Sequence, residues 1–373
     1  MRLTGLRRAP AQVDVAVVGG GLPSLATALE LARRGASVAV VQDAVSAERA
    51  PDLGLMLLGP GRPYAAVARA IGRPAAQLLW AAGCENHLRI KAFLDQASRP
   101  CGYVARGSFL LARDRRDAED LAESEDMLRD DGFPGEFLDH YMLETRFDVT
   151  GFPGAYWAAE DAEFDPLELA AAVGQAARDA KVAFPTARAR ALRPAASGVV
   201  VELEKGWLRS AAAVVATDGP AAGLVPELAP LLRPQFVARL SLSALAGAAL
   251  PGALRTADGR IAWQATGASF LLAETGVGPP GAGEGLLTEF AARLPFDAGS
   301  ARMQQEAGEV SVDGLPVVGR LPGPPLAVAC GFARLSPGLA FAAARWVADA
   351  LLRGTDPTPD ALRPTRAPRS AGV

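Results

Sequence analysis

The sequence is poor in the residues from which disulfide frameworks and metal centres are built. Its 373 residues contain three cysteines and two histidines. Cys84, Cys101 and Cys330 are odd in number, far apart in the chain and in no C-x-x-C pair, so neither a disulfide framework nor a zinc site is predicted. With only His87 and His140 available, a histidine-rich metal site is excluded, and His87 is expected to be an exposed residue of a helix.

The sequence also lacks long apolar runs and a marked excess of either charge. No segment reaches transmembrane length without interruption, and the arginines near the N-terminus precede no apolar run long enough for a signal peptide. The formal net charge is -3, and acidic and basic residues are interspersed, so no basic stripe for nucleic acid is present. We therefore expect a cytoplasmic protein with no transmembrane segment and no nucleic-acid partner.

What the sequence does contain is a nucleotide-binding pattern near its N-terminus. An apolar strand at residues 14–18 runs into Gly19-Gly20-Gly21, and a helix-patterned segment then leads to a second apolar strand at residues 38–41. This spacing predicts a βαβ unit whose turn leaves backbone N–H groups at the positive end of a helix, where a pyrophosphate binds. A bound dinucleotide is predicted, and the alternative is a βαβ unit that is merely structural.

Each residue of the turn has a physical reason to be there. Gly19 suits a tight turn, and Gly21 has no Cβ to keep a phosphate from the backbone. Leu22 opens the apolar face of the helix, and Pro23 suits its first turn because a proline lacks the N–H that would be unpaired there. Ser24 replaces the third small residue of the G-x-G-x-x-G pattern. The predicted cofactor contacts here are Gly19, Gly21, Leu22 and Ser24.

The end of the second strand departs from the dinucleotide pattern. An Asp or Glu is expected there to accept hydrogen bonds from the adenosine ribose. The sequence instead has Gln42, followed by Asp43. An amide bonds a hydroxyl more weakly than a carboxylate does, and of the two residues Gln42 is the preferred ribose contact because Asp43 alternates to the other face.

Further along the chain, more strand and helix patterns follow, and a strand again ends in a turn of small polar residues. Asp165 opens a helix expected over residues 167–180, and strands are expected around residues 182–184, 199–203 and 211–215. The last of these ends in Thr217-Asp218-Gly219. The chain is long enough for two domains, and half of it is hydrophobic, so a sizeable core is available.

The C-terminal part repeats this geometry. A segment from Asp313 to Gly319 precedes an apolar strand at residues 326–330, and Gly331 then leads to a helix expected over residues 337–352. This order of motifs, together with the glycine triplet and the Thr217 turn, resembles the D-amino acid oxidase family of FAD-dependent oxidoreductases, which includes glycine and sarcosine oxidases.

The resemblance implies an α/β fold in which a Rossmann-like FAD-binding domain is interleaved with a substrate domain built on an antiparallel sheet. The FAD-binding domain is expected over residues 13–79, 152–220 and 322–354. The substrate domain is expected over residues 80–151 and 221–321. Residues 1–12 and 355–373 are expected to be tails, and the second is expected to be a disordered end with no assigned role.

The resemblance also implies cofactor contacts beyond the first turn. The helix expected to begin near Pro337 would point its free N–H groups at flavin N1 and the C2 carbonyl, and Arg334 would place positive charge near the flavin or a substrate carboxylate, or else lie on the surface. Arg62, in a loop that differs from the family pattern, would contact the pyrophosphate. The further predicted contacts are Gly61, Val182, Thr217, Asp218, Gly219, Gly331, Ser336, Pro337 and Gly338.

Two observations bear on the substrate. Asp258-Gly259 lies between strand-like runs and predicts a hairpin, which places Trp263 either in the substrate cavity or in the core. Many relatives carry an arginine shortly before the Asp-Gly segment to bind the substrate carboxylate, but residues 309–312 contain none. The substrate is then not a simple amino acid, or its anchor lies elsewhere.

The predicted function is oxidation of the C–N bond of an amino acid, N-alkyl amino acid or related amine, by hydride transfer to N5 of FAD. No catalytic side chain is assigned, and no metal is predicted. The alternative is a redox-silent or auxiliary subunit that keeps the fold for assembly with a partner, since several site positions depart from the family pattern. A nicotinamide dehydrogenase ranks third. The expected partners are a small amine or amino acid and an electron acceptor or partner subunit.

Overall fold

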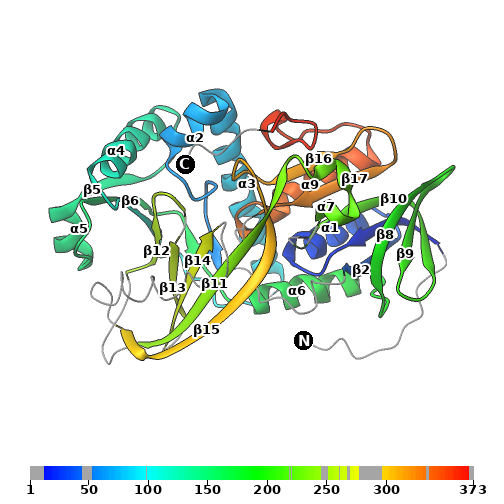
Figure 1. Ribbon diagram of the computed structural model, residues 1–373, viewed down its shortest axis with the longest axis horizontal. Helices are drawn as coiled ribbons and strands as arrows, with labels where there is room; N and C mark the ends of the chain where they lie inside the picture. Colours follow the sequence, from blue (N-terminus) through cyan, green and yellow to red (C-terminus); the bar gives the residue numbers. More distant parts are fainter. Residues whose placement is uncertain are drawn as a thin grey trace.

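The computed structural model describes residues 12–43, 53–97, 99–217, 219, 221–244, 251–259, 261–266, 269–276, 296–332 and 336–368. Two large sheets lie on opposite sides of the molecule, and the long helix α3 (Arg73–Ala97) runs between them (Figure 1). This is the expected combination of a Rossmann-like unit with a second unit built mainly on antiparallel strands.

The first large sheet contains the predicted βαβ unit. Four of its seven strands, β2, β1, β10 and β17, lie side by side in parallel, and β8 also pairs parallel with the end of β2. Because these four strands are parallel, their carboxyl ends meet at one edge of the sheet. The strands are β1 (Gln12–Val18), β2 (Val38–Asp43), β8 (Arg188–Ala195), β9 (Gly198–Leu203), β10 (Trp207–Val215), β16 (Val317–Arg320) and β17 (Leu326–Cys330).

Alternation along β1 explains how this sheet is covered. Val15 and Val17 face a core shared with α1 (Leu22–Arg33), α6 (Pro166–Asp179) and α9 (Ala340–Leu352). Ala16 and Val18 point to the other face, whose core includes β8 and β9 together with α7 (Ala221–Leu224) and the turn η2 (Pro226–Leu228). Because successive side chains of a strand face opposite ways, the continuous apolar run of β1 predicts burial on both faces.

The second large sheet has eight strands in the order β15, β11, β14, β13, β12, β4, β6 and β5. Its neighbours are antiparallel except for the parallel pair β12 and β4. The predicted hairpin at Asp258-Gly259 is confirmed, because it joins β12 to β13. The strands are β4 (Ser108–Leu111), β5 (Glu136–Asp139), β6 (Gly154–Ala158), β11 (Leu232–Ala244), β12 (Ala253–Thr256), β13 (Ile261–Thr266), β14 (Ser269–Gly276) and β15 (Phe296–Ser311).

The remaining elements connect or cover the two large sheets. The strands β3 and β7 form a small antiparallel sheet of their own, and α2 packs against α4 at the upper left of Figure 1. The bounds of these elements are β3 (Leu55–Met56), β7 (Ala162–Glu163), α2 (Tyr64–Ile71), α4 (Arg115–Asp130) and α5 (His140–Phe147). Among the described residues, no helix combines the length and the apolar character that crossing a membrane requires.

The division of the chain into two discontinuous domains stays a prediction, but two strands lie in the sheet opposite to the expected one. Strand β6 falls inside the segment 152–220, yet it pairs with β4 and β5 of the eight-stranded sheet. Strand β16 falls inside the segment 221–321, yet it pairs with β17 of the seven-stranded sheet. Both strands lie close to predicted domain borders, where the chain passes from one sheet to the other.

Two expected elements are shorter than predicted. Residues 182–184 form only a single bridge, between Ala183 and Ala39, and no named strand. The last helix begins at Ala340, because the residues before it form the separate 3-10 turn η3 (Ser336–Gly338). The Ser-Pro-Gly sequence is compatible with such a tight turn, which the helical pattern alone did not reveal.

Two expectations about exposure are wrong. His87 is half-buried, both of its ring nitrogens are buried, and this burial lowers its pKa to about 4. The C-terminal segment at residues 355–368 is packed instead of disordered, since Leu362 and Thr358 are buried there. Arg366 in this segment forms a buried ion pair with Asp313, with Nε 2.8 Å from one carboxylate oxygen and Nη2 2.9 Å from the other. The bidentate pair explains why the segment is ordered.

Candidate functional site

The predicted phosphate-binding turn lies between the end of β1 and the start of α1. Gly19 has a φ of 149°, and a Cβ at this position would lie 2.0 Å from the carbonyl oxygen of Ala216, so the residue after β10 approaches too closely for any side chain. At Gly21 the situation is the reverse. A Cβ there would meet only an atom of Pro23, at 3.7 Å. The space over Gly21 is open, and a side chain would fill it.

The first turn of α1 has no cap from a side chain. Gly21 occupies the N-cap position, and no side chain bonds the first amides of the helix. Among the described residues no acceptor is found for the amides of Gly20, Gly21 and Leu22. Unpaired donors at a helix N-terminus, beside open space, form an anion site.

The contacts of Ser24 explain why a serine occupies the third small-residue position of the glycine pattern. It is fully buried, and its hydroxyl donates a hydrogen bond to the carbonyl oxygen of Gly21 at 2.7 Å. The hydroxyl is therefore used inside the turn, where it stabilises the conformation that leaves the amides free.

Several of the other predicted contacts lie at the edge formed by the four parallel strands. Gln42 is the next-to-last residue of β2 and is half-buried, Thr217 follows β10, and Gly331 follows β17. The hydroxyl oxygen of Thr217 accepts a hydrogen bond from the amide of Gly219 at 2.8 Å and so closes the turn after β10. Val182 lies away from this edge, because the next residue, Ala183, pairs with Ala39 near the start of β2, and the role of Val182 stays a prediction.

Some predicted contacts cannot be placed. Asp218 and Arg334 lie outside the described residues. The backbones of Asp43 and Ser336 are described, but their side chains are not. Their roles stay predictions.

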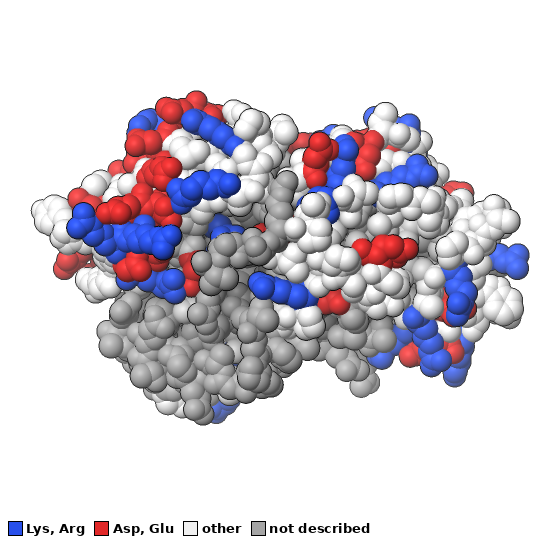
Figure 2. All heavy atoms as spheres, turned by 45° about the horizontal axis from the view of Figure 1, so that its top comes forward, with Lys and Arg blue, Asp and Glu red and all other residues white. Residues whose placement is uncertain are grey.

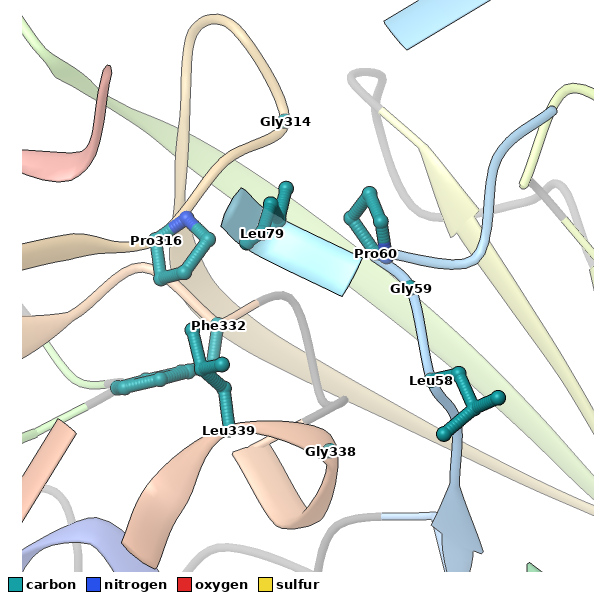
Figure 3. Close-up of a pocket in the computed structure, with 9 residues that line it drawn as sticks. All are labelled: Leu58, Gly59, Pro60, Leu79, Gly314, Pro316, Phe332, Gly338 and Leu339. Carbon is teal, nitrogen blue, oxygen red and sulfur yellow. The ribbon is translucent and has the colours of Figure 1, made fainter. Parts of the chain in front are cut away.

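A first pocket lies where the start of the last helix faces the loop after β3. Nine residues line it, and their side chains are apolar (Figure 3). Predicted contact Gly338 is one of them, and it touches the loop closely, since a Cβ there would lie 3.0 Å from the carbonyl oxygen of Leu57. The first pocket is lined by Leu58, Gly59, Pro60, Leu79, Gly314, Pro316, Phe332, Gly338 and Leu339.

Glycines let this loop lie directly against α3. A Cβ on Gly83 of α3 would lie 1.8 Å from the carbonyl oxygen of Leu58, and a Cβ on Gly59 would lie 2.3 Å from the ring of Trp80. The loop is also tied down by Asp161, whose carboxylate accepts the amide of Leu58 at 2.9 Å. The wall of the first pocket is thus fixed from two sides.

Asn86 holds the start of α9 and was not singled out from the sequence as a site residue. This fully buried amide on α3 donates to the carbonyl oxygen of Pro337 at 2.7 Å, and its oxygen accepts the amides of Phe341 at 2.9 Å and Ala342 at 3.2 Å. Two amides near the start of the last helix are therefore already paired. The expectation that this helix offers all its free N–H groups to a ligand is corrected, and Gly338 and Leu339 are the residues that line the pocket.

A second pocket adjoins the first and shares Leu58 and Gly59 with it. It differs in containing charged groups, of which Arg255 and Asp161 are both buried. Burial raises the pKa of Asp161 to about 6, although its bonds from Ser108 and Leu58 act in the other direction. The second pocket is lined by Leu57, Leu58, Gly59, Gly61, Arg62, Trp80, Ser108, Phe109, Leu110, Pro134, Tyr156, Ala158, Asp161 and Arg255.

The predicted contacts Gly61 and Arg62 belong to the second pocket. Nη1 of Arg62 lies 3.7 Å from the position of a Cβ on Gly314, which lines the first pocket. Arg62 is half-buried between the two pockets, so its neighbours favour a role beside them over a contact with the first glycine turn. Trp263 lines neither pocket. It is 1% exposed and packs with Phe109 and Leu254, which is the core role that the sequence left open.

The described residues contain no cluster of three or more histidine, cysteine or acidic side chains suited to a metal ion. On the face shown in Figure 2, acidic and basic groups interleave over α4 and do not form a field of one sign. The candidate site thus consists of the phosphate cradle at Gly21 and the two adjoining pockets.

Comparisons with known proteins agree with this arrangement. A family model described as FAD dependent oxidoreductase matches residues 14–350. A glycine oxidase of Geobacillus kaustophilus (strain HTA426) is 26% identical over 215 residues, which are 57% of this chain and 56% of the relative. The match thus spans little more than half the length of that curated relative.

Solved structures show the same fold over nearly the whole chain. The crystal structure of glycine oxidase from Geobacillus kaustophilus has a TM-score of 0.79 at 23% identity and covers 96% of this chain and 100% of that one. An L-amino acid deaminase from Proteus vulgaris has a TM-score of 0.78 at 16% identity and covers 98% and 100%. At these identities the likeness establishes the fold.

Proposed function

Because the chain belongs to the D-amino acid oxidase family of FAD-dependent oxidoreductases, we propose that it oxidises the C–N bond of an amino acid, an N-alkyl amino acid or a related amine. The matching glycine oxidase and the deaminase of the same fold act on amino acids, which supports this substrate class. When bound, FAD accepts the two electrons and the hydrogen that leave the carbon beside nitrogen. The residues of this chain would bind the cofactor and position the substrate.

The single observation that carries the proposal is the open, amide-lined cradle at Gly21. Its unpaired donors at the start of α1 suit a diphosphate, and the absence of a Cβ leaves the room that the diphosphate needs. Gln42 lies at the carboxyl end of β2, where it would hold the adenosine part. The residues present therefore fit FAD.

The first pocket would hold the flavin ring between the loop after β3 and the start of α9. Leu58, Leu79 and Phe332 give it apolar walls that exclude water from the reacting atoms (Figure 3). Asn86 orients the backbone at the start of α9, which keeps Gly338 and Leu339 in the pocket wall. The substrate would enter the second pocket, because the two pockets meet at Leu58 and Gly59.

The experiment is anaerobic reduction of the purified flavoprotein. We expect bound flavin whose visible absorbance is lost on addition of at least one member of a panel of amino acids and N-methylated amino acids. Bound flavin that no member of the panel reduces, in a protein that copurifies with another subunit, would instead support the redox-silent or auxiliary role.

A further inference from the structure

We propose that Arg255 is the anchor for the carboxylate of the substrate, and that this enzyme consequently oxidises anionic amino acids in preference to neutral amines. The inference rests on the proposed function and narrows its substrate class. It assigns the role to strand β12, which lies outside the segment where the resembled family carries its arginine.

The guanidinium of Arg255 is buried in the wall of the second pocket. Only 4% of the residue is exposed, although arginine is rarely buried without a partner. Its strand is held on both sides, by β4 and β13, so the base of the side chain is fixed. A buried, rigidly mounted guanidinium at a pocket wall is already oriented for a ligand.

The loop after β3 makes room for this guanidinium. A Cβ on Gly61 would lie 1.7 Å from Nη1 of Arg255 and 2.3 Å from its Cζ, so a side chain there would displace the guanidinium. Gly61 also has a φ of 73°, which a glycine adopts at little cost. Gly61, which was expected to contact the cofactor, thus leaves room for the side chain of Arg255.

Among the residues that the structure describes, none makes a hydrogen bond or an ion pair with the guanidinium of Arg255. Its Nε is buried without a partner, and among the described residues no carboxylate lies within ion-pair distance of the guanidinium. The acids whose charge acts on it are Asp161 and Asp258. Asp161 is bonded to Ser108 at 2.6 Å and to Leu58, while Asp258 pairs with Arg113 at 2.7 Å. The donors of Arg255 are therefore free for an external acceptor.

The charge of the second pocket favours a monoanion. Arg62 lines it too and forms no ion pair in the described structure, because Asp313 is taken by Arg366 and Asp258 by Arg113. Two guanidinium groups thus face one carboxylate, that of Asp161. The surplus of one positive charge matches one carboxylate, and a guanidinium fork binds a carboxylate through two parallel hydrogen bonds.

The position of the second pocket indicates that the carboxylate belongs to the substrate. The second pocket shares Leu58 and Gly59 with the pocket assigned to the flavin ring, so an acid bound at Arg255 lies next to the site of oxidation. Phe109, Trp80 and Tyr156 line the second pocket together with Arg255. Because Arg255 is buried, its pairing with a carboxylate is stronger than it would be in water.

The test is calorimetric titration of the purified holoprotein with benzoate and with benzamide, its neutral counterpart. We expect benzoate to bind the wild type at least tenfold more tightly than benzamide. Arg255→Met should weaken benzoate about a hundredfold and leave benzamide unchanged, and Arg255→Lys should weaken benzoate about tenfold because the fork is lost. Arg193→Met, which removes an exposed arginine of β8, is the control and should match the wild type.

The outcomes separate this proposal from the proposed function. Equal benzoate affinity in the wild type and Arg255→Lys and Arg255→Met, or equal affinity of the wild type for benzoate and benzamide, would overturn the anchor while bound flavin remained. A protein without flavin would overturn the proposed function, yet benzoate titration of that flavin-free protein would still show whether Arg255 binds a carboxylate. If Arg255→Met does not fold, Arg255→Lys keeps the charge and decides the question.

Discussion

The side-chain oxygen of Asn86 accepts the backbone amide of Phe341 at 2.9 Å and so joins α3 to the start of α9 across 255 positions of sequence. The same side chain also bonds Pro337 and Ala342. One buried amide therefore fixes the turn that lines the first pocket. Backbone groups at a helix start that lie away from water need such a partner.

Asn86→Leu should destabilise the protein by about 3 kcal/mol, because it leaves two amides and one carbonyl buried without partners. It should also weaken FAD binding by loosening the pocket wall. Urea unfolding and FAD titration would measure the two effects. Gln77→Leu, an exposed amide on the same helix, is the matched control and should change neither. A loss below about 0.5 kcal/mol for Asn86→Leu would mean that this contact does not hold α9.

Two glycines of one turn should respond in opposite ways. Gly21→Val should abolish FAD retention and leave the unfolding free energy nearly unchanged, because Gly21 has a φ of -89° and open space around it. Gly19→Ala should unfold or strongly destabilise the protein, since its Cβ would lie 2.0 Å from a carbonyl oxygen. Flavin absorbance and thermal unfolding separate the two cases. A Gly21→Val protein fully loaded with FAD would refute the cradle.

Asp161 should make stability depend on pH in a mildly acidic range. Burial raises its folded-state pKa from 3.8 to about 6, so between these values the folded protein holds a proton that the unfolded chain has released. The unfolding free energy contributed by this group therefore falls as pH rises from about 4 to 6, by roughly 3 kcal/mol at most. Asp161→Asn should flatten this slope in urea unfolding at pH 4, 5 and 6. An unchanged slope would show that Asp161 is ionised throughout.

The pair of Arg366 and Asp313 should be essential to the fold. Arg366→Met leaves a buried carboxylate without its counter-charge and should cost about 3–5 kcal/mol. Removal of all residues after Gly354 should cost at least as much. Arg353→Met, an exposed arginine that precedes the segment, should cost less than about 1 kcal/mol. Denaturant unfolding of the three variants would decide, and a truncated protein as stable as the wild type would contradict this reading.

The parts of the fold that follow from the sequence are the local ones. The glycine triplet between an apolar strand and an amphipathic segment predicts β1, the turn and α1, because every contact involved lies within about thirty residues. The turns after β10 and β17 are likewise predicted from residues next to one another. The start of α9 is not, since Pro337 is equally compatible with a helix start and with the 3-10 turn that forms.

The site residues that sequence analysis did not single out contact partners that lie far away in the sequence. Arg255 is buried by Gly61 from a distant loop, and nothing near residue 255 in the chain reveals this contact. Asp161 likewise meets Leu58 only in the folded state. Asn86 did leave a signal, because it falls on the buried face of α3 between Gly83 and Ile90. A polar residue on an apolar helix face requires a partner, and that requirement marks it as a site worth examining.

A crystal structure of the protein with FAD tests the central claim most directly. We predict the diphosphate over Gly21 at the start of α1 and the flavin ring between the loop at Leu58 and the turn at Gly338. Electron density for FAD anywhere else, or a crystal soaked in FAD whose cradle holds no ligand, would contradict the account.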